Sequence, residues 1–414
     1  MTPVRRSALA APSTRWFTVR WSGRSWADLS LAAVSLALLT IHLRSGLRLS
    51  PDSHTYISWA KVLRDDGFDV VQYLSHNAHV SSPFFYLLPV ALIAALQQIF
   101  GATWQTAFLT VNLGLMLAMI ALFRKIALGL GVRPHICAGL FPVFLVSADM
   151  LTWPHFLLSD MLFAVLVLAA VGLALVDRLF SWGVAIVGGL VLLMILVARP
   201  SAPPAVAVIG GFMVLSGLNL KARPKYPANA MLAAVAGIIT VVLLAAIGYG
   251  WLMQSVLSGR IQGEPLEYLG QMVTKGMVVH DRPDTFVAID GGVLDIARLY
   301  GWRLLAFFSP YASSYSLTHI LGNSVVLGLP MAALVAVVCR QTQLTPRQWQ
   351  AVALLLALSL GFAMFHAATL IDYDWRYRFP TVVPLLLFTA VVGEGVLRTR
   401  SARRQDLAVV ALAR

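Results

Sequence analysis

Long apolar runs separated by polar links restrict this chain to one kind of fold. Runs near 20 residues recur along most of its 414 residues, long enough to cross a hydrocarbon core of about 30 Å. Because lipid offers no hydrogen-bond partner to a bare backbone amide, each crossing run must be helical. Only 12% of the residues are charged, against roughly 25% in soluble domains. The sequence therefore predicts an all-α, polytopic membrane protein.

The apolar runs define ten predicted spans and one further segment. The spans cover residues 27–43, 103–122, 134–150, 159–177, 182–198, 204–220, 229–251, 319–339, 349–370 and 379–397. The further segment, 82–100, is long enough to be an eleventh span. Lysine and arginine gather on the cytoplasmic side of membrane proteins, and most of them fall inside only if 82–100 does not cross. We therefore expect ten crossings, with 82–100 lying on the outer surface or shallowly re-entrant.

The charge pattern assigns each part of the chain to one side of the membrane. The N-terminal tail 1–26 and the C-terminal tail 399–414 are basic and are predicted to be cytoplasmic. The predicted transmembrane domain, 27–398, carries an outer juxtamembrane loop at 44–102 and a long outer loop at 252–318. This topology explains the net charge of +13, so no nucleic-acid partner is expected. We expect a multi-pass protein of the cytoplasmic membrane.

Acidic side chains fall mainly on the outer side of this topology, and the middles of the spans carry almost no charge. An ionisable group at the bilayer centre costs at least about 2.5–3.5 kcal/mol, so transporters keep one only for function. The sequence also shows no internal repeat of the transporter kind. It therefore argues against an ion-coupled pump and favours chemistry at the periplasmic or extracellular boundary of the membrane.

The segment "PDSHTYISWA", residues 51–60, follows the first span and holds the first candidate site residues. Asp52 and His54 lie at the start of a predicted amphipathic helix, and Tyr56 lies on its apolar face. An aspartate there could be an accessible catalytic acid or base. It could equally cap the helix, which would contribute about 1 kcal/mol.

Two more outer segments hold candidate residues. "HNAHVSSPFFYLL" places His79 just before the non-crossing segment, where it could meet a lipid phosphate or simply be solvated. "DMLTWPHFLLSDMLF" holds Asp149 in a loop and Asp160 at the start of a span. Here too a helix cap and a favourable interaction with the helix dipole are the alternative.

The segment "DYDWRYRFP", residues 372–380, places two arginines on the outer side, against the usual charge bias. Arg376 and Arg378 carry planar guanidinium groups that suit phosphate at the depth of a lipid headgroup. Pairing with Asp372 and Asp374 is the alternative.

Taken in chain order, these segments resemble the GT-C superfamily of integral-membrane glycosyltransferases, in particular bacterial relatives of the dolichyl-phosphate-mannose protein mannosyltransferases. The matching elements are "PDSHTYISWA", "SPFFYLL", "LLSDMLF", "ARPSAPP" at 198–204 and "RYRFPTVVP". The resemblance covers most of 27–397 through short motifs. Many close relatives have Lys-Pro-Pro where this chain has Ser81-Ser82-Pro83, so His79 could replace the missing phosphate contact.

The resemblance implies transfer of a sugar from a polyprenyl-phosphate carrier to a glycan, lipid or protein acceptor at the outer face. It makes Asp52 a general base for the acceptor hydroxyl, and Asp160 a second acid that orients a substrate. The donor phosphate would be held by Arg376, Arg378, Arg199, His79 and Tyr56. Further candidates for the acceptor side or the second acid are Asp149 and His54. Some members use a divalent cation and others use none, and the sequence leaves this undecided.

Two other functions fit the same pattern. A surface-polysaccharide polymerase or ligase would use arginine and histidine of the long outer loop, namely Arg260, His280, Arg282, Arg298 and Arg303. A non-enzymatic translocator of lipids or oligosaccharides would instead line a central cavity with charged residues.

Overall fold

The computed structural model is almost entirely helical, and it describes residues 26–76, 83–175, 182–218, 277–278, 286–287, 301–311, 315–369 and 375–413. Its helices, in chain order, are α1 (Trp26–Ser45), α2 (Pro51–Asp65), α3 (Val70–His76), η1 (Phe84–Tyr86), α4 (Leu87–Phe100), η2 (Gly101–Thr103), α5 (Trp104–Gly129), α6 (Pro134–Leu140), α7 (Val143–Val146), α8 (Ala148–Thr152), η3 (Trp153–His155), α9 (Asp160–Ala174), α10 (Trp182–Leu196), α11 (Pro203–Leu218), α15 (Leu317–Val338), α16 (Pro346–Thr369), η5 (Trp375–Arg378) and α17 (Phe379–Ala413). Two short strands, β1 (Met277–Val278) and β2 (Phe286–Val287), pair antiparallel.

Several helices are long and apolar enough to cross a membrane. Within the described ranges there are five such stretches: Trp26–Ser45, Phe84–Gly129, Leu317–Val338, Pro346–Ala367 and Arg376–Ala411. A sixth exists if the bent pair Pro134–Val146 and Ala148–His155 counts as one span. Shorter apolar helices cover Asp160–Ala174, Gly183–Leu196 and Pro203–Val214. The predicted span 229–251 lies outside the described residues, as do residues 1–25 of the N-terminal tail.

The predicted single span at 134–150 is wrong in its continuity. Three short helices, α6 to α8, replace it, and the chain bends by 60° at their last junction. Pro142 has no backbone N–H to continue the first helix. Ser147 then adopts an extended conformation (φ −69°, ψ 115°), and its side chain accepts a hydrogen bond from the Met150 amide that starts α8. After the bend the chain continues through α8 and η3 towards α9.

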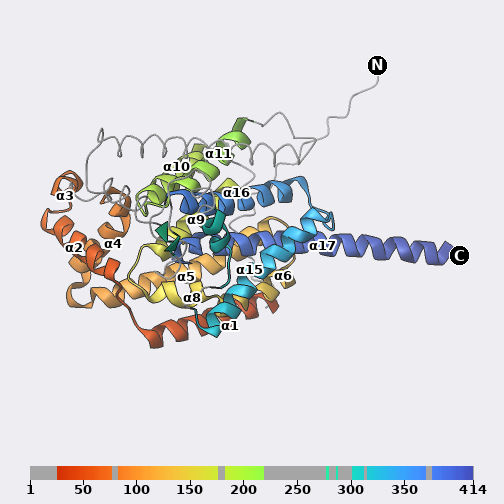
Figure 1. Cartoon of the computed structure of the whole chain (residues 1–414), viewed down its shortest axis with the longest axis horizontal. Helices are drawn as coiled ribbons and strands as arrows, with labels where there is room; N and C mark the ends of the chain where they lie inside the picture. The colour runs from red at the N-terminus through yellow and green to blue at the C-terminus, as the bar shows by residue number, and fades with distance from the viewer. Residues whose placement is uncertain are drawn as a thin grey trace, which may run out of the picture.

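The centre of the bundle is formed by α9 and the first half of α17. α9 is buried on nearly all sides, and it packs against α5, α10 and α17. A helix that is apolar all round suits the interior of a bundle or of a membrane. α17 continues beyond the core to Ala413, so the predicted tail 399–414 is a largely exposed extension of a helix rather than a separate segment. This extension projects from one end of the molecule (Figure 1).

The opposite end of the molecule carries α2, α3 and α4 (Figure 1). Two ion pairs at the α17 end show which helix ends lie together. Asp28 at the start of α1 pairs with Arg124 near the end of α5, and Glu394 of α17 accepts from Arg133 at 3.0 Å. The starts of α1 and α6 therefore lie at the same end of the bundle as the end of α5. This proximity agrees with the prediction that the segment 82–100, which contains α4, does not cross, but the number of crossings stays a prediction.

Candidate functional site

A hydrogen-bonded link fixes the start of α2 against the loop that precedes α9. The Arg48 amide donates to the His155 carbonyl at 2.7 Å, and the Leu157 amide donates back to the Arg48 carbonyl at 3.0 Å. The Ser53 hydroxyl donates to the Leu157 carbonyl at 2.8 Å. Two segments about 100 residues apart are thereby held side by side, and each is followed closely by a candidate acid.

Asp52 does not cap its helix, so the capping alternative is wrong here. Ser50 is the N-cap of α2 and forms a reciprocal capping box with Ser53. The Asp52 carboxylate instead accepts a hydrogen bond from the Arg376 guanidinium at 2.6 Å, across 324 positions of sequence. The Asp52 side chain is 43% exposed and that of Arg376 is 19% exposed. The pair is therefore charge-assisted, correctly spaced and open to an incoming molecule.

The other two predicted acids form deeply buried ion pairs. Asp160, the first residue of α9, pairs with Arg199. Asp149 lies 3.7 Å from the Arg378 guanidinium and accepts a hydrogen bond from Trp153 at 3.1 Å. All four charged side chains of these two pairs are at most 5% exposed. Ser159, not Asp160, is the N-cap of α9, so the capping half of the alternative is wrong for Asp160. Asp160 does lie in the first turn, where a carboxylate interacts favourably with the helix dipole.

Tyr377 links the two arginines that bind Asp52 and Asp160. The guanidinium carbons of Arg199 and Arg376 each lie 5.5 Å from the centre of its ring. The His366 ring stacks on Tyr377 with centroids 4.7 Å apart and planes 9° apart. Cation–π contacts of this kind hold guanidinium groups in place without neutralising them. The arrangement fixes the positions of both positive charges.

Tyr56 lies on the buried face of α2 and packs against Tyr86 of η1, with ring centroids 5.0 Å apart. Burial raises the pKa of Tyr56 well above its ordinary value, with smaller opposing effects from Arg199 and the Ser159 hydroxyl. The phenol is therefore neutral at physiological pH and can donate a hydrogen bond. The Leu88 amide donates to the Val197 carbonyl at 2.9 Å, which holds this segment against the one that carries Arg199.

Arg303, from the end of the predicted loop 252–318, lies in the same region. It is fully buried and donates to the Ala367 carbonyl at 3.4 Å. Arg199 and Arg303 both lie within electrostatic range of His366. Among the described residues, the site thus combines four guanidinium groups with three carboxylates, namely Arg199, Arg303, Arg376, Arg378, Asp52, Asp149 and Asp160. The excess positive charge favours an anionic ligand.

The structure does not bring every predicted residue into this cluster. His54 is exposed on α2, two residues beyond Asp52 and thus on the other side of the helix. His79 lies outside the described residues, as do Asp372 and Asp374 of the alternative pairing. Of the polymerase candidates, only Arg303 falls within the described ranges.

Three aromatic residues of the cluster were not singled out from the sequence. Tyr86 lies within the quoted "SPFFYLL" segment and Tyr377 lies between the two predicted arginines. His366 had the clearest signal, because it is a polar residue near the C-terminal end of an otherwise apolar run. Its stacking on Tyr377 depends on packing between α16 and η5, which the sequence does not reveal.

A metal requirement stays open. Within the described part of the chain, no three side chains of the metal-binding types are grouped as ligands.

Searches for related proteins return no match. No family model matches this chain, and neither a curated protein nor a solved structure matches it. The resemblance to GT-C enzymes therefore depends on the quoted motifs.

Proposed function

We propose that this chain is a polyprenyl-phosphate-dependent glycosyltransferase of the GT-C kind, with about ten spans in the cytoplasmic membrane and its site on the outer face. The observation that carries the proposal is the pair of Asp52 and Arg376, in contact at 2.6 Å and partly exposed beside two buried ion pairs. The described structure accounts for five or six of these spans. The other spans and the orientation belong to the proposal.

The chemistry assigns different tasks to the two members of this pair. The phosphate of the donor competes with Asp52 for Arg376, and the bidentate guanidinium suits it. Asp52 is then available to accept the proton of the acceptor hydroxyl. The acceptor oxygen attacks the anomeric carbon, the bond from that carbon to the phosphate oxygen breaks, and its electron pair leaves with the polyprenyl phosphate. Arg376 stabilises the charge that develops there.

The buried pairs act as a supporting frame in this mechanism. Asp160 holds Arg199, which with Arg376 flanks Tyr377, and Asp149 holds Arg378. Removing one partner of a buried ion pair leaves an uncompensated charge. These residues therefore position the site, while Asp52 and Arg376 would contact the substrates.

Loss of the base tests the proposal directly. Membranes containing the wild type or Asp52→Asn are given a panel of radiolabelled polyprenyl-phosphate sugars, and labelled acceptor is measured. We expect Asp52→Asn to lower transfer by about 10²–10⁴-fold, the usual contribution of a general base. Arg376→Ala should also lower transfer.

The matched control is Asp65→Asn, the same change on an exposed carboxylate of the same helix. It should transfer sugar as the wild type does. If the wild type and Asp52→Asn are present in the membrane in equal amounts and transfer sugar equally, the proposal is wrong. The polymerase or ligase alternative is favoured only by the burial of Arg303 in the cluster, and it predicts activity that survives Asp52→Asn but not Arg303→Ala.

A further inference from the structure

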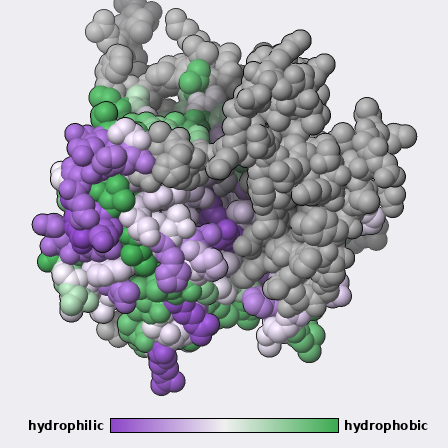
Figure 2. All heavy atoms as spheres, turned by 60° about the vertical axis from the view of Figure 1, so that its left-hand side comes forward, coloured by the Kyte–Doolittle hydropathy of each residue, from purple (hydrophilic) through white to green (hydrophobic). Residues whose placement is uncertain are grey.

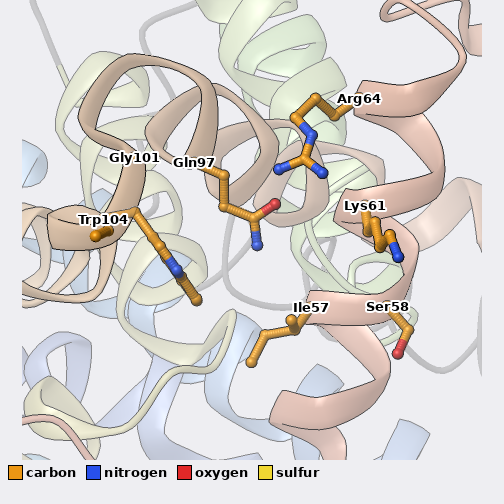
Figure 3. A pocket seen from close by; sticks show the side chains of 8 residues that line it. Ile57, Ser58, Lys61, Arg64, Gln97, Gly101 and Trp104 are labelled. Atoms are coloured by element: carbon orange, nitrogen blue, oxygen red, sulfur yellow. The ribbon is translucent and has the colours of Figure 1, made fainter.

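A cavity of about 370 Å³ lies between α2 and the junction of α4 with α5. Figure 3 shows its lining, which is Ile57, Ser58, Lys61, Arg64, Gln97, Gly101, Ala102 and Trp104. Helical periodicity of 100° per residue places Ser58, Lys61 and Arg64 on the face of α2 opposite Asp52. The cavity is therefore separate from the cluster around Asp52. Its volume lies within the roughly 300–1,000 Å³ typical of ligand pockets.

The lining of this cavity is positively charged. Lys61 and Arg64, about one turn apart on α2, face Gln97 and Trp104 on the other wall (Figure 3). None of the lining residues is acidic. Arg64 also contacts its neighbour Asp65 at 3.2 Å, but Asp65 is 54% exposed, and such surface pairs contribute little. A phosphate can therefore share or displace that contact.

Gln97 adds a side-chain oxygen that lacks a hydrogen-bond partner in the described part of the chain. Its side-chain oxygen is buried at the cavity wall, and within the described residues it has no hydrogen-bond partner. Buried polar atoms are nearly always paired, with protein, water or ligand. A hydroxyl group of a bound molecule would satisfy it.

Exposed apolar side chains place the cavity at a membrane surface. Ile99 and Phe100, at the end of α4, are 71% and 48% exposed, and Phe68, just after α2, is 41% exposed. Figure 2 shows this end of the molecule, where hydrophilic and hydrophobic residues lie next to each other. Tryptophan at the start of an apolar helix and basic residues beside exposed apolar ones are typical of the lipid headgroup region.

We propose that this cavity binds the phosphate of an anionic phospholipid with a hydroxylated headgroup. Lys61 and Arg64 would bind the phosphate, and Gln97 would accept a hydrogen bond from a headgroup hydroxyl. A choline headgroup would instead bring its own positive charge against Lys61. Such a lipid would hold α2 against the membrane surface, whatever reaction occurs on the opposite face of the helix.

Short-chain lipids test the proposal on the full-length protein in detergent. Titration calorimetry with dihexanoyl phosphatidylglycerol is compared with dihexanoyl phosphatidylcholine and with inorganic phosphate. We expect the glycerol lipid to bind, and the double variant Lys61→Ala/Arg64→Ala to weaken binding by about tenfold or more, as loss of charge-assisted hydrogen bonds predicts. Ser58→Trp, which fills the cavity without changing its charge, should weaken binding too.

The matched control is Arg44→Ala/Arg48→Ala. It removes two exposed positive charges that precede α2 and do not line the cavity, and it should bind the lipid as the wild type does. If inorganic phosphate binds and this binding also depends on Lys61 and Arg64, the cavity is a phosphate site whose ligand is a soluble anion rather than a lipid. Equal binding of both lipids, or no effect of either cavity variant, would overturn the proposal.

Discussion

His366 is a buried residue whose surroundings favour a ligand. Its ring is fully buried and stacks on Tyr377, yet in the described part of the chain neither ring nitrogen has a hydrogen-bond partner. Unpaired buried polar atoms cost about 1–3 kcal/mol each. Under the proposed function, sugar hydroxyl groups would satisfy these nitrogens between the two nearby cations, Arg199 and Arg303.

Replacing His366 with phenylalanine distinguishes a role of the ring nitrogens in substrate binding from a role in the stability of the fold. Phenylalanine keeps the flat ring that stacks on Tyr377 but removes both nitrogens, so we expect thermal unfolding to be unchanged or stabilised by about 1 kcal/mol. We expect the KM for the sugar donor to rise several-fold in the transfer assay, as for a lost substrate hydrogen bond. His135→Phe, on the exposed surface of α6, is the control and should leave KM unchanged. An unaltered KM in His366→Phe would show that the nitrogens do not meet the substrate.

Residue types and motifs were sufficient to single out Asp52, Asp160 and Arg376. Their partners were not predictable, because Asp52 and Arg376 meet across 324 positions through the packing of the whole bundle. Local sequence suggested Asp372 and Asp374 as partners of the two arginines, whereas the described contacts are with Asp52 and Asp149.

At the scale of elements, the bend at the end of α7 depends on a close approach by α15. A Cβ atom added at Gly322 would lie 2.1 Å from the Val146 carbonyl oxygen. Glycine therefore permits α15 to pack directly on the backbone where the helix breaks. This break leads directly into α8, so Asp149 lies in a short helix and not in the predicted loop. The contact between α15 and Val146 therefore supports the segment that carries Asp149 and leads to Asp160.

Gly322→Ala should therefore destabilise the fold. The added methyl group requires a backbone shift, which we expect to cost about 1–3 kcal/mol in thermal unfolding. Gly328→Ala is the matched control on the same helix, because nothing lies within 4 Å of its added Cβ. It should be neutral or stabilising by up to about 1 kcal/mol through higher helix propensity. Similar melting of the two variants would contradict the packing argument.

The positions of the apolar runs predicted where several helices lie, but they did not predict where a helix is interrupted. α1, α9 and α15 begin and end within a few residues of the predicted spans, because the limits of an apolar run coincide with the helix ends. The break at Ser147 lies inside an apolar run, where proline, a capping serine and a distant glycine act together. Such combinations become visible only when the helices are packed.

At the scale of the whole molecule, the pairing of Asp28 with Arg124 bears on topology. The start of α1 and the end of α5 lie together, so an even number of crossings separates them. The predicted topology, in which α1 and α5 each cross once and α4 does not cross, agrees with this pairing. The contact between Asp52 and Arg376 likewise shows that the end of α1, which leads into α2, lies near the start of α17. The orientation in a membrane stays a prediction from the charge bias.

Cysteine labelling tests that topology in intact cells. In a background with Cys137→Ala and Cys339→Ser, single cysteines are placed by Ser75→Cys before the segment 82–100, by Ala102→Cys after it, and by Gln341→Cys at the opposite end of the bundle. All three positions are exposed. If 82–100 does not cross, a membrane-impermeant maleimide should label positions 75 and 102 from outside, and position 341 only after permeabilisation. A crossing segment would reverse the outcome at positions 102 and 341 while leaving position 75 labelled. It would also place Asp28 and Arg124 on opposite sides of the membrane, in disagreement with their ion pair.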